Sequence, residues 1–150
     1  MLEKENVFVI SLDAEGRWSR YHHLFQDLLK RQLQRHCPSN EITTLHSRAS
    51  EWFESQGLIT ESIKHALAAE DHVRAVEIVE RHRHNEFDAD RWYVVERWLA
   101  MIPAKVKRQR PSLLMTDGWV AYCRLQLERI PVLIQQCEAA VGDRTLETEQ

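Results

Sequence analysis

Residues 59–79, ITESIKHALAAEDHVRAVEIV, contain two short amphipathic segments separated by a polar turn. In both segments apolar residues recur every three or four positions, which places them on one face of an α-helix. These residues are Ile63, Ala66 and Leu67 in the first segment and Val73, Val76 and Val79 in the second. Thr60 and Asp71 carry side chains suited to capping the two helix starts. The stretch therefore predicts a helical hairpin whose apolar faces need neighbouring helices to cover them.

Amphipathic helices continue on both sides of this hairpin. A preceding helix is predicted to start at Ser39 or Asn40 and to end at Gly57, because glycine accepts the left-handed backbone of a helix end. A later helix runs from Trp92 to Pro103. Two more begin at Pro111 and Pro131, since proline is tolerated in the first helical turn.

The predicted helices pair into three units that start near residues 41, 72 and 111. The offsets, roughly 31 and 39 residues, straddle the 34-residue period of tetratricopeptide repeats. We therefore predict a degenerate array of antiparallel helix pairs, similar to a tetratricopeptide superhelix, over residues 38–142. The polar residues 143–150 are expected to form a frayed tail.

The first 21 residues have the pattern of β-strands and not of helices, since side-chain character follows a period of two. Val7–Leu12 is apolar and β-branched, Asp13–Gly16 has turn chemistry, and Arg17–Tyr21 alternates polar and aromatic residues. This order predicts a β-hairpin. A helix follows from His22 to Cys37, with an apolar stripe formed by Leu24, Phe25, Leu28, Leu29 and Leu33. The expected fold class is thus mainly α, with a short N-terminal β-hairpin.

Composition narrows the function classes. The 150 residues include 20 Lys and Arg against 23 Asp and Glu, a net charge of −3, whereas a dedicated nucleic-acid binder is usually basic. Direct DNA contact by this segment is therefore not expected. No apolar run is long enough to span a membrane, and the opening MLEKEN is not a signal peptide. The three cysteines form no CxxC pair, which favours a reducing cytoplasm.

Enzyme and metal chemistry find no support in the sequence. No GxxxxGK[ST] or GxGxxG loop is present, and neither HExxH nor paired CxxC completes a zinc site. His82 and His84 point in different directions on a helix, because only residues three or four apart share a face. We expect the polar stretch Arg81–Asp90 to be a solvated region at a helix end, and the basic run Lys105–Arg110 to be a solvated loop. The chain is predicted to be neither an enzyme nor a metal protein, and to hold no cofactor itself.

Aromatic residues are the candidates for partner binding. Trp52, Trp92 and Trp119 fall inside helical patterns and are expected to anchor the core of the repeats. Trp98 lies off the apolar stripe of its helix, so that it fits either a groove or a partly buried core position. Trp98 and Tyr122 are therefore the predicted partner-binding residues.

Several motifs resemble those of MalT-like, ATP-dependent regulators of the LuxR type. RYHHLF at residues 20–25 is similar to their R-Y-H-x-L-F segment, and HSRASEWFESQG at residues 46–57 resembles their HxRAxxWFxxxG helix. IKHALAAED at residues 63–71 matches their AIxHALAAxD pattern, and RPSLL at residues 110–114 fits RPxLL. These motifs occur in the same order and cover about residues 7–125.

The resemblance implies an internal fragment of a larger signal-transduction ATPase. Residues 1–37 would be the end of its winged-helix piece, and residues 38–142 would begin its helical sensor. The ATP- or ADP-binding module would lie upstream, and further sensor repeats and a DNA-binding helix-turn-helix downstream. His22 matches a winged-helix histidine that can contact nucleotide phosphates. An equally good interpretation is a histidine that satisfies backbone groups at a helix start.

The sequence thus predicts a non-enzymatic linker and sensor segment that responds to a small-molecule inducer or a regulatory protein. The alternative is a free-standing tetratricopeptide-like adaptor that binds a peptide or protein partner in its groove.

Overall fold

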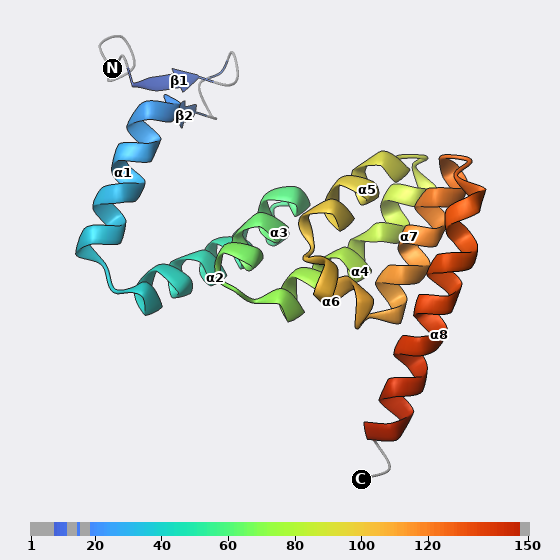
Figure 1. Ribbon diagram of the computed structural model, residues 1–150. Helices are drawn as coiled ribbons and strands as arrows, with labels where there is room; N and C mark the ends of the chain where they lie inside the picture. The colour runs from blue at the N-terminus through green and yellow to red at the C-terminus, as the bar shows by residue number, and fades with distance from the viewer. Residues whose placement is uncertain (1–7, 12–14, 16–18, 148–150) are drawn as a thin grey trace. The chain divides into compact units, whose positions relative to one another are not determined.

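The computed structural model describes residues 8–11, 15 and 19–147, and these are predominantly helical (Figure 1). The strands are β1 (Val9–Ser11) and β2 (Ser19–Tyr21), and the first helices are α1 (His23–His36) and α2 (Ser39–Ser55). The remaining α-helices are α3 (Ile59–Ala68), α4 (His72–Asp88), α5 (Trp92–Met101), α6 (Ala104–Arg108), α7 (Pro111–Cys123) and α8 (Ile130–Glu147). The chain divides into two compact units at residues 42 and 43.

The first unit contains the predicted hairpin. β1 and β2 pair antiparallel, with Ile10 opposite Arg20. Phe25 of α1 stacks on Phe8 with ring centroids 4.9 Å apart and meets the edge of Tyr21 at 5.3 Å. Helix α1 buries none of its residues among the described part of the chain, and its apolar stripe is open to solvent. The predicted turn residues Asp13, Ala14 and Gly16 lie outside the described residues.

The second unit is an array of helices in which α3, α4, α5, α7 and α8 lie side by side in that order (Figure 1). α3, α4, α5 and α7 each contribute to one buried cluster, and α7 and α8 form a smaller one. The large cluster is Ile63, Ala66, Ala75, Val76, Ile78, Val79, Val95, Trp98, Leu99, Ile102, Leu113 and Val120. The predicted helix pairs correspond to α2 with α3, α4 with α5, and α7 with α8.

Four helices of this array end in the same way. A residue with positive φ follows each of them: Gly57 (73°), Glu70 (58°), Asp90 (57°) and Leu125 (59°). At each end the next residue donates its backbone N–H to the carbonyl five positions earlier, as Leu58 does to Phe53 and Asp71 does to Ala66. This is the Schellman motif, which satisfies the last carbonyls of a helix. The repeated turn gives the array its internal regularity although the sequence repeats are weak.

Several helix boundaries differ from the prediction. The polar stretch Arg81–Asp90 is helical as far as Asp88, because Arg81 and Arg83 find partners on α2 and α7. The basic run Lys105–Arg110 is largely the short helix α6 and not a loop, since Pro103 precedes its first turn. α8 continues to Glu147, so residues 143–147 are helical, and 148–150 lie outside the described residues.

Some side chains also lie elsewhere than predicted. Asp71 caps α4 by accepting from the backbone N–H of Arg74 at 2.9 Å, as expected. Thr60 instead lies inside the first turn of α3, and its hydroxyl accepts a hydrogen bond from Trp98. Trp52 and Trp119 are 50% and 55% exposed and do not anchor the core. Val73 is 53% exposed as well, because it lies in the first turn of α4.

Candidate functional site

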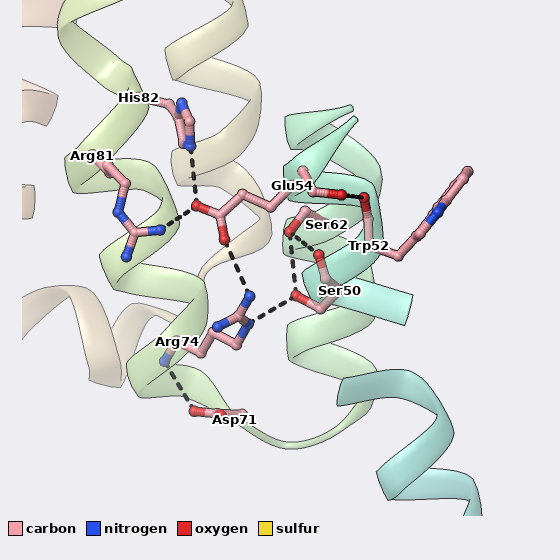
Figure 2. A network of polar contacts seen from close by, with 9 residues as sticks. Ser50, Trp52, Glu54, Ser62, Asp71, Arg74, Arg81 and His82 are labelled. Atoms are coloured by element: carbon pink, nitrogen blue, oxygen red, sulfur yellow. Dashed lines mark hydrogen bonds and ion pairs between the residues drawn. The ribbon is translucent and has the colours of Figure 1, made fainter. Parts of the chain in front are cut away.

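The carboxylate of Glu54 at the end of α2 is contacted by two arginines and one histidine of α4 (Figure 2). Arg74 Nη2 donates to Oε2 at 3.1 Å, and His82 Nε2 lies 3.1 Å from Oε1. Arg81 Nη1 also donates to Oε1. Arg74 and Arg81 are seven residues apart, two helical turns, so their side chains lie on the same side of α4 and both reach the one carboxylate. The Glu54 side chain is only 13% exposed, which makes this contact well shielded.

The pKa of Glu54 reflects two opposed effects. Burial raises the pKa because it disfavours the charged carboxylate. The hydrogen bond from His82 and the positive charges of Arg81 and Arg74 lower the pKa and outweigh burial. The Glu54 carboxylate therefore stays ionised at pH values below the ordinary glutamate pKa of 4.5.

Ser50 and Ser62 extend this network into the contact between α2 and α3. Both are fully buried, and their hydroxyl oxygens are 3.2 Å apart. Ser62 donates to the carbonyl of Ser50 at 2.8 Å, and Arg74 Nε donates to the Ser50 hydroxyl at 3.2 Å. Arg74 thereby connects Glu54, Ser50 and its own helix cap at Asp71 (Figure 2). We call this set the Glu54 network; its members are Ser50, Glu54, Ser62, Asp71, Arg74, Arg81 and His82.

Two histidines meet in the same contact between α2 and α3. The Nδ1 atoms of His46 and His65 are 2.8 Å apart, so one nitrogen carries the proton and the other accepts it. The ring of His65 also stacks on Phe53, with centroids 5.1 Å apart. Burial and the proximity of His46 lower the pKa of His65. Both histidines lie in the motifs that carry the family resemblance.

Polar contacts also connect α4 to α7. Ser112 donates its hydroxyl to Glu80, and Arg83 Nη1 donates to the carbonyl of Ser112 at 2.8 Å and to the Thr116 hydroxyl. The first helices of the three pairs, α2, α4 and α7, are thus joined in series by charged hydrogen bonds. Such bonds are stronger than neutral ones and fix the orientation of neighbouring helices.

A cleft of about 370 Å³ lies between α4 and α7. Phe87, Met115 and Trp119 supply its apolar wall, and Arg83, His84, Asp88 and Thr116 its polar groups. A neighbouring groove of about 250 Å³ between α7 and α8 shares Met115 and Trp119 and also contains Tyr122. The rings of Phe87, Trp119 and Tyr122 follow one another, with centroids 6.4 and 5.8 Å apart.

The sequence-predicted site residues lie in three separate places. Trp98 is 2% exposed and packs in the core with its Nε1 bonded to Thr60 at 2.8 Å, so it does not line a groove. Tyr122 is 57% exposed and lines the groove between α7 and α8. His22 precedes α1, and its backbone N–H donates to the Phe8 carbonyl at 2.6 Å. His22 belongs to the first unit and the other two to the second.

Sequence reasoning missed Glu54, Arg74 and Arg83. The one available signal was the seven-residue spacing of Arg74 and Arg81 along α4, which places them on one face of the helix. Among the described residues, no group of three His, Cys, Asp or Glu side chains is arranged to hold a metal ion. Within the same residues, no helix has both the length and the apolar character needed to cross a membrane.

Comparison with known proteins connects both units to one kind of regulator. Residues 1–41 match the model of the MalT winged helix domain. Over 149 residues, or 99% of its length, the chain is 27% identical to the HTH-type transcriptional regulator MalT of Yersinia enterocolitica. It is 28% identical to MalT of Serratia proteamaculans over the same length. The chain spans 16% of the length of these relatives.

A second kind of relative matches a shorter stretch. The serine/threonine-protein kinase PknK of Mycobacterium tuberculosis is 32% identical over 117 residues, which are 78% of this chain and 10% of the kinase. No solved structure gave a significant match.

Proposed function

We propose that this chain, a MalT-like regulator segment, connects the sensing of a ligand or partner to an ATPase switch and a DNA-binding module outside the chain. It acts without catalysis of its own, in the cytoplasm. ATP or ADP binds the upstream module, and further sensor repeats follow downstream in the same polypeptide. The similarity to MalT along 99% of the chain supports this assignment.

The observation that carries the proposal is the position of α2. Its first residues, from Ser39, belong to the stretch that matches the MalT winged helix domain, and its last turn carries Glu54. One continuous helix therefore leads from the winged-helix segment to the contact with α4. A change in the hydrogen bonds between Glu54 and the side chains of α4 would change how firmly α2 packs against α4. A similar segment also occurs in a serine/threonine-protein kinase, PknK. This occurrence is consistent with a segment that can connect different modules.

The mechanism we propose is a shift between two states of the regulator. An inducer or regulatory protein bound to the helical array stabilises one arrangement of the α2–α4 contact, and nucleotide at the upstream module stabilises the other. Such a shift requires that each ligand bind the two states with different affinity. The hinge that we propose lies around Cys37 to Asn40, where Cys37 has an extended backbone after the end of α1. Proline there prevents the two helices from fusing.

His22 is proposed to contact the phosphates of the nucleotide held by the upstream module. Its position immediately before α1, beside His23 with ring centroids 4.2 Å apart, supports this proposal. A histidine is suited to the role because it donates hydrogen bonds from both ring nitrogens when it is protonated.

A peptide-binding adaptor is the second candidate, favoured by the exposed groove that contains Tyr122. In that case the groove receives an apolar side chain of a partner, and no ATPase is involved. Trp98 takes no part, because it is buried.

The reading frame around the segment separates the two functions. A regulator predicts a GxxxxGK[ST] loop encoded upstream and a helix-turn-helix downstream, and the encoded protein should bind both ATP and promoter DNA. Stop codons close to both ends of the segment, or an encoded protein that binds neither, would contradict the regulator and leave the adaptor.

A further inference from the structure

We propose that the cleft between α4 and α7 is a binding site for a small monocarboxylate that carries an aromatic or other apolar body. This inference rests on the proposed sensor role and names the chemical class of the ligand. The cleft lies between the first helices of two successive pairs. Its volume of about 370 Å³ falls in the range of small-molecule sites.

Arg83 provides the anchor for the carboxylate. Its Nη1 is occupied by Ser112 and Thr116, which hold the guanidinium in one orientation. Its Nε is buried and has no acceptor among the described residues. A buried donor without a partner costs free energy, so an acceptor brought by a ligand would be favoured there. The planar guanidinium is well suited to a carboxylate, which can accept two parallel hydrogen bonds.

The charge of the cleft sets the number of negative charges on the ligand. Arg83 contributes one permanent positive charge and Asp88 one negative charge. A doubly charged group such as a phosphate monoester would be repelled by the Asp88 carboxylate, and the described lining of the cleft offers no second permanently charged cation to offset that repulsion. A single carboxylate is therefore the better match.

The apolar wall selects the rest of the ligand. Phe87 and Trp119 lie edge to face, with ring centroids 6.4 Å apart, and Met115 adds a flexible thioether beside them. Trp119 is 55% exposed, a large apolar area that a flat ring can cover. Met115 is 61% exposed and can adapt to the shape of the ligand. Together these side chains fit a phenyl- or indole-sized body next to the guanidinium.

The direct test is isothermal titration calorimetry of the 150-residue chain with 3-phenylpropionate and indole-3-propionate. The uncharged 3-phenylpropionamide is the matched control ligand. We expect saturable binding of the acids and at least about tenfold weaker binding of the amide, because a charged hydrogen bond is lost. Trp119→Ala should weaken binding of the acids at least about fivefold. Trp52→Ala, at an equally exposed tryptophan of α2, should leave it unchanged.

Arg83→Lys separates the guanidinium from simple charge, since lysine keeps the charge and loses the planar donor pair. It should also weaken acid binding, with helical content checked by circular dichroism. No saturable binding of either acid, or equal binding of acid and amide, would overturn the inference. Equal losses in Trp119→Ala and Trp52→Ala would overturn it too. The proposed regulator is tested separately, since ATP and promoter binding by the surrounding protein do not depend on this cleft.

Discussion

The Nδ1 atoms of His46 on α2 and His65 on α3 lie 2.8 Å apart, close enough to share one proton. Because burial and His46 lower the pKa of His65, the folded chain binds a proton at this ring less readily than the unfolded chain. Above the ordinary histidine pKa of 6.5, His65 therefore does not lower the free energy of unfolding. As the pH falls below that value, protonation of the unfolded chain is favoured and the free energy of unfolding decreases. Glu61 and Lys64 act on His65 in opposite directions and do not reverse this effect.

Urea unfolding at about pH 7.5 and about pH 5.5 should reveal the effect as a lower free energy of unfolding in acid. His65→Gln should reduce this difference, because glutamine does not titrate. The matched control, His84→Gln on the exposed side of α4, should keep the pH dependence of the wild type. An unchanged pH dependence in His65→Gln would show that the histidine pair is not its source.

Glu54→Gln is expected to destabilise the chain by about 1–3 kcal/mol, because it leaves the partly buried Arg74 without a countercharge. Glu61→Gln is the matched control, since Glu61 forms a surface pair with Lys64 and its loss should cost less than about 1 kcal/mol. Thermal and urea unfolding measure both values. Equal stability of the two variants would mean that the Glu54 network contributes nothing to the fold.

The same carboxylate predicts a second pH effect at lower pH. The pKa of Glu54 lies below its ordinary value of 4.5, so its contribution is present above that value and is lost as the pH falls below it. Between about pH 5 and about pH 3 the wild type should lose more stability than Glu54→Gln. Parallel losses in the two proteins would contradict this assignment.

Thr60 and Trp98 offer a test of the buried contact between α3 and α5. Thr60→Val keeps the shape of the side chain but removes the acceptor for Trp98 Nε1, and should cost about 1–3 kcal/mol. Thr60→Ser keeps a hydroxyl and should cost less. If serine and valine prove equally destabilising, the hydrogen bond is not what holds Trp98.

The cap of α4 is expected to contribute about 1 kcal/mol through the bond from the Arg74 N–H to Asp71. Asp71→Ala removes the acceptor, whereas Asp71→Asn retains one and should remain close to wild type in thermal unfolding. A large loss in the asparagine variant would point to the charge and not to the cap.

The sequence predicts the helices well where local chemistry decides their ends. Gly57 and Asp71 mark a helix end and a helix start as expected. Glu70, Asp90 and Leu125 adopt the same left-handed conformation as Gly57, but Glu and Leu give no signal for it and Asp only a weak one. Those turns form because the flanking helices pack against each other and because the Schellman hydrogen bonds offset the strain.

The candidate site was harder to predict, because it depends on tertiary neighbours. Trp98 follows Val95 by three positions and therefore shares its buried face, contrary to the sequence-based expectation, and Thr60 of α3 accepts a hydrogen bond from its N–H group. Trp119 lies within an apolar pattern but is 55% exposed and lines a cleft, where its nearest aromatic contact on α4 is Phe87. The sequence predicts Arg83 to be a solvated residue at a helix end, whereas in the structure it donates hydrogen bonds to α7.

The most direct test of the account is the inducer-dependent transcription that the regulator carrying this segment drives from its own promoter. Glu54→Gln, which weakens the contact between α2 and α4, should change the ratio of induced to uninduced transcription at least about fivefold, the size of a typical coupling between sites. Glu61→Gln should keep the ratio of the wild type. A wild-type ratio in a folded Glu54→Gln protein would show that α2 does not couple the helical array to the switch.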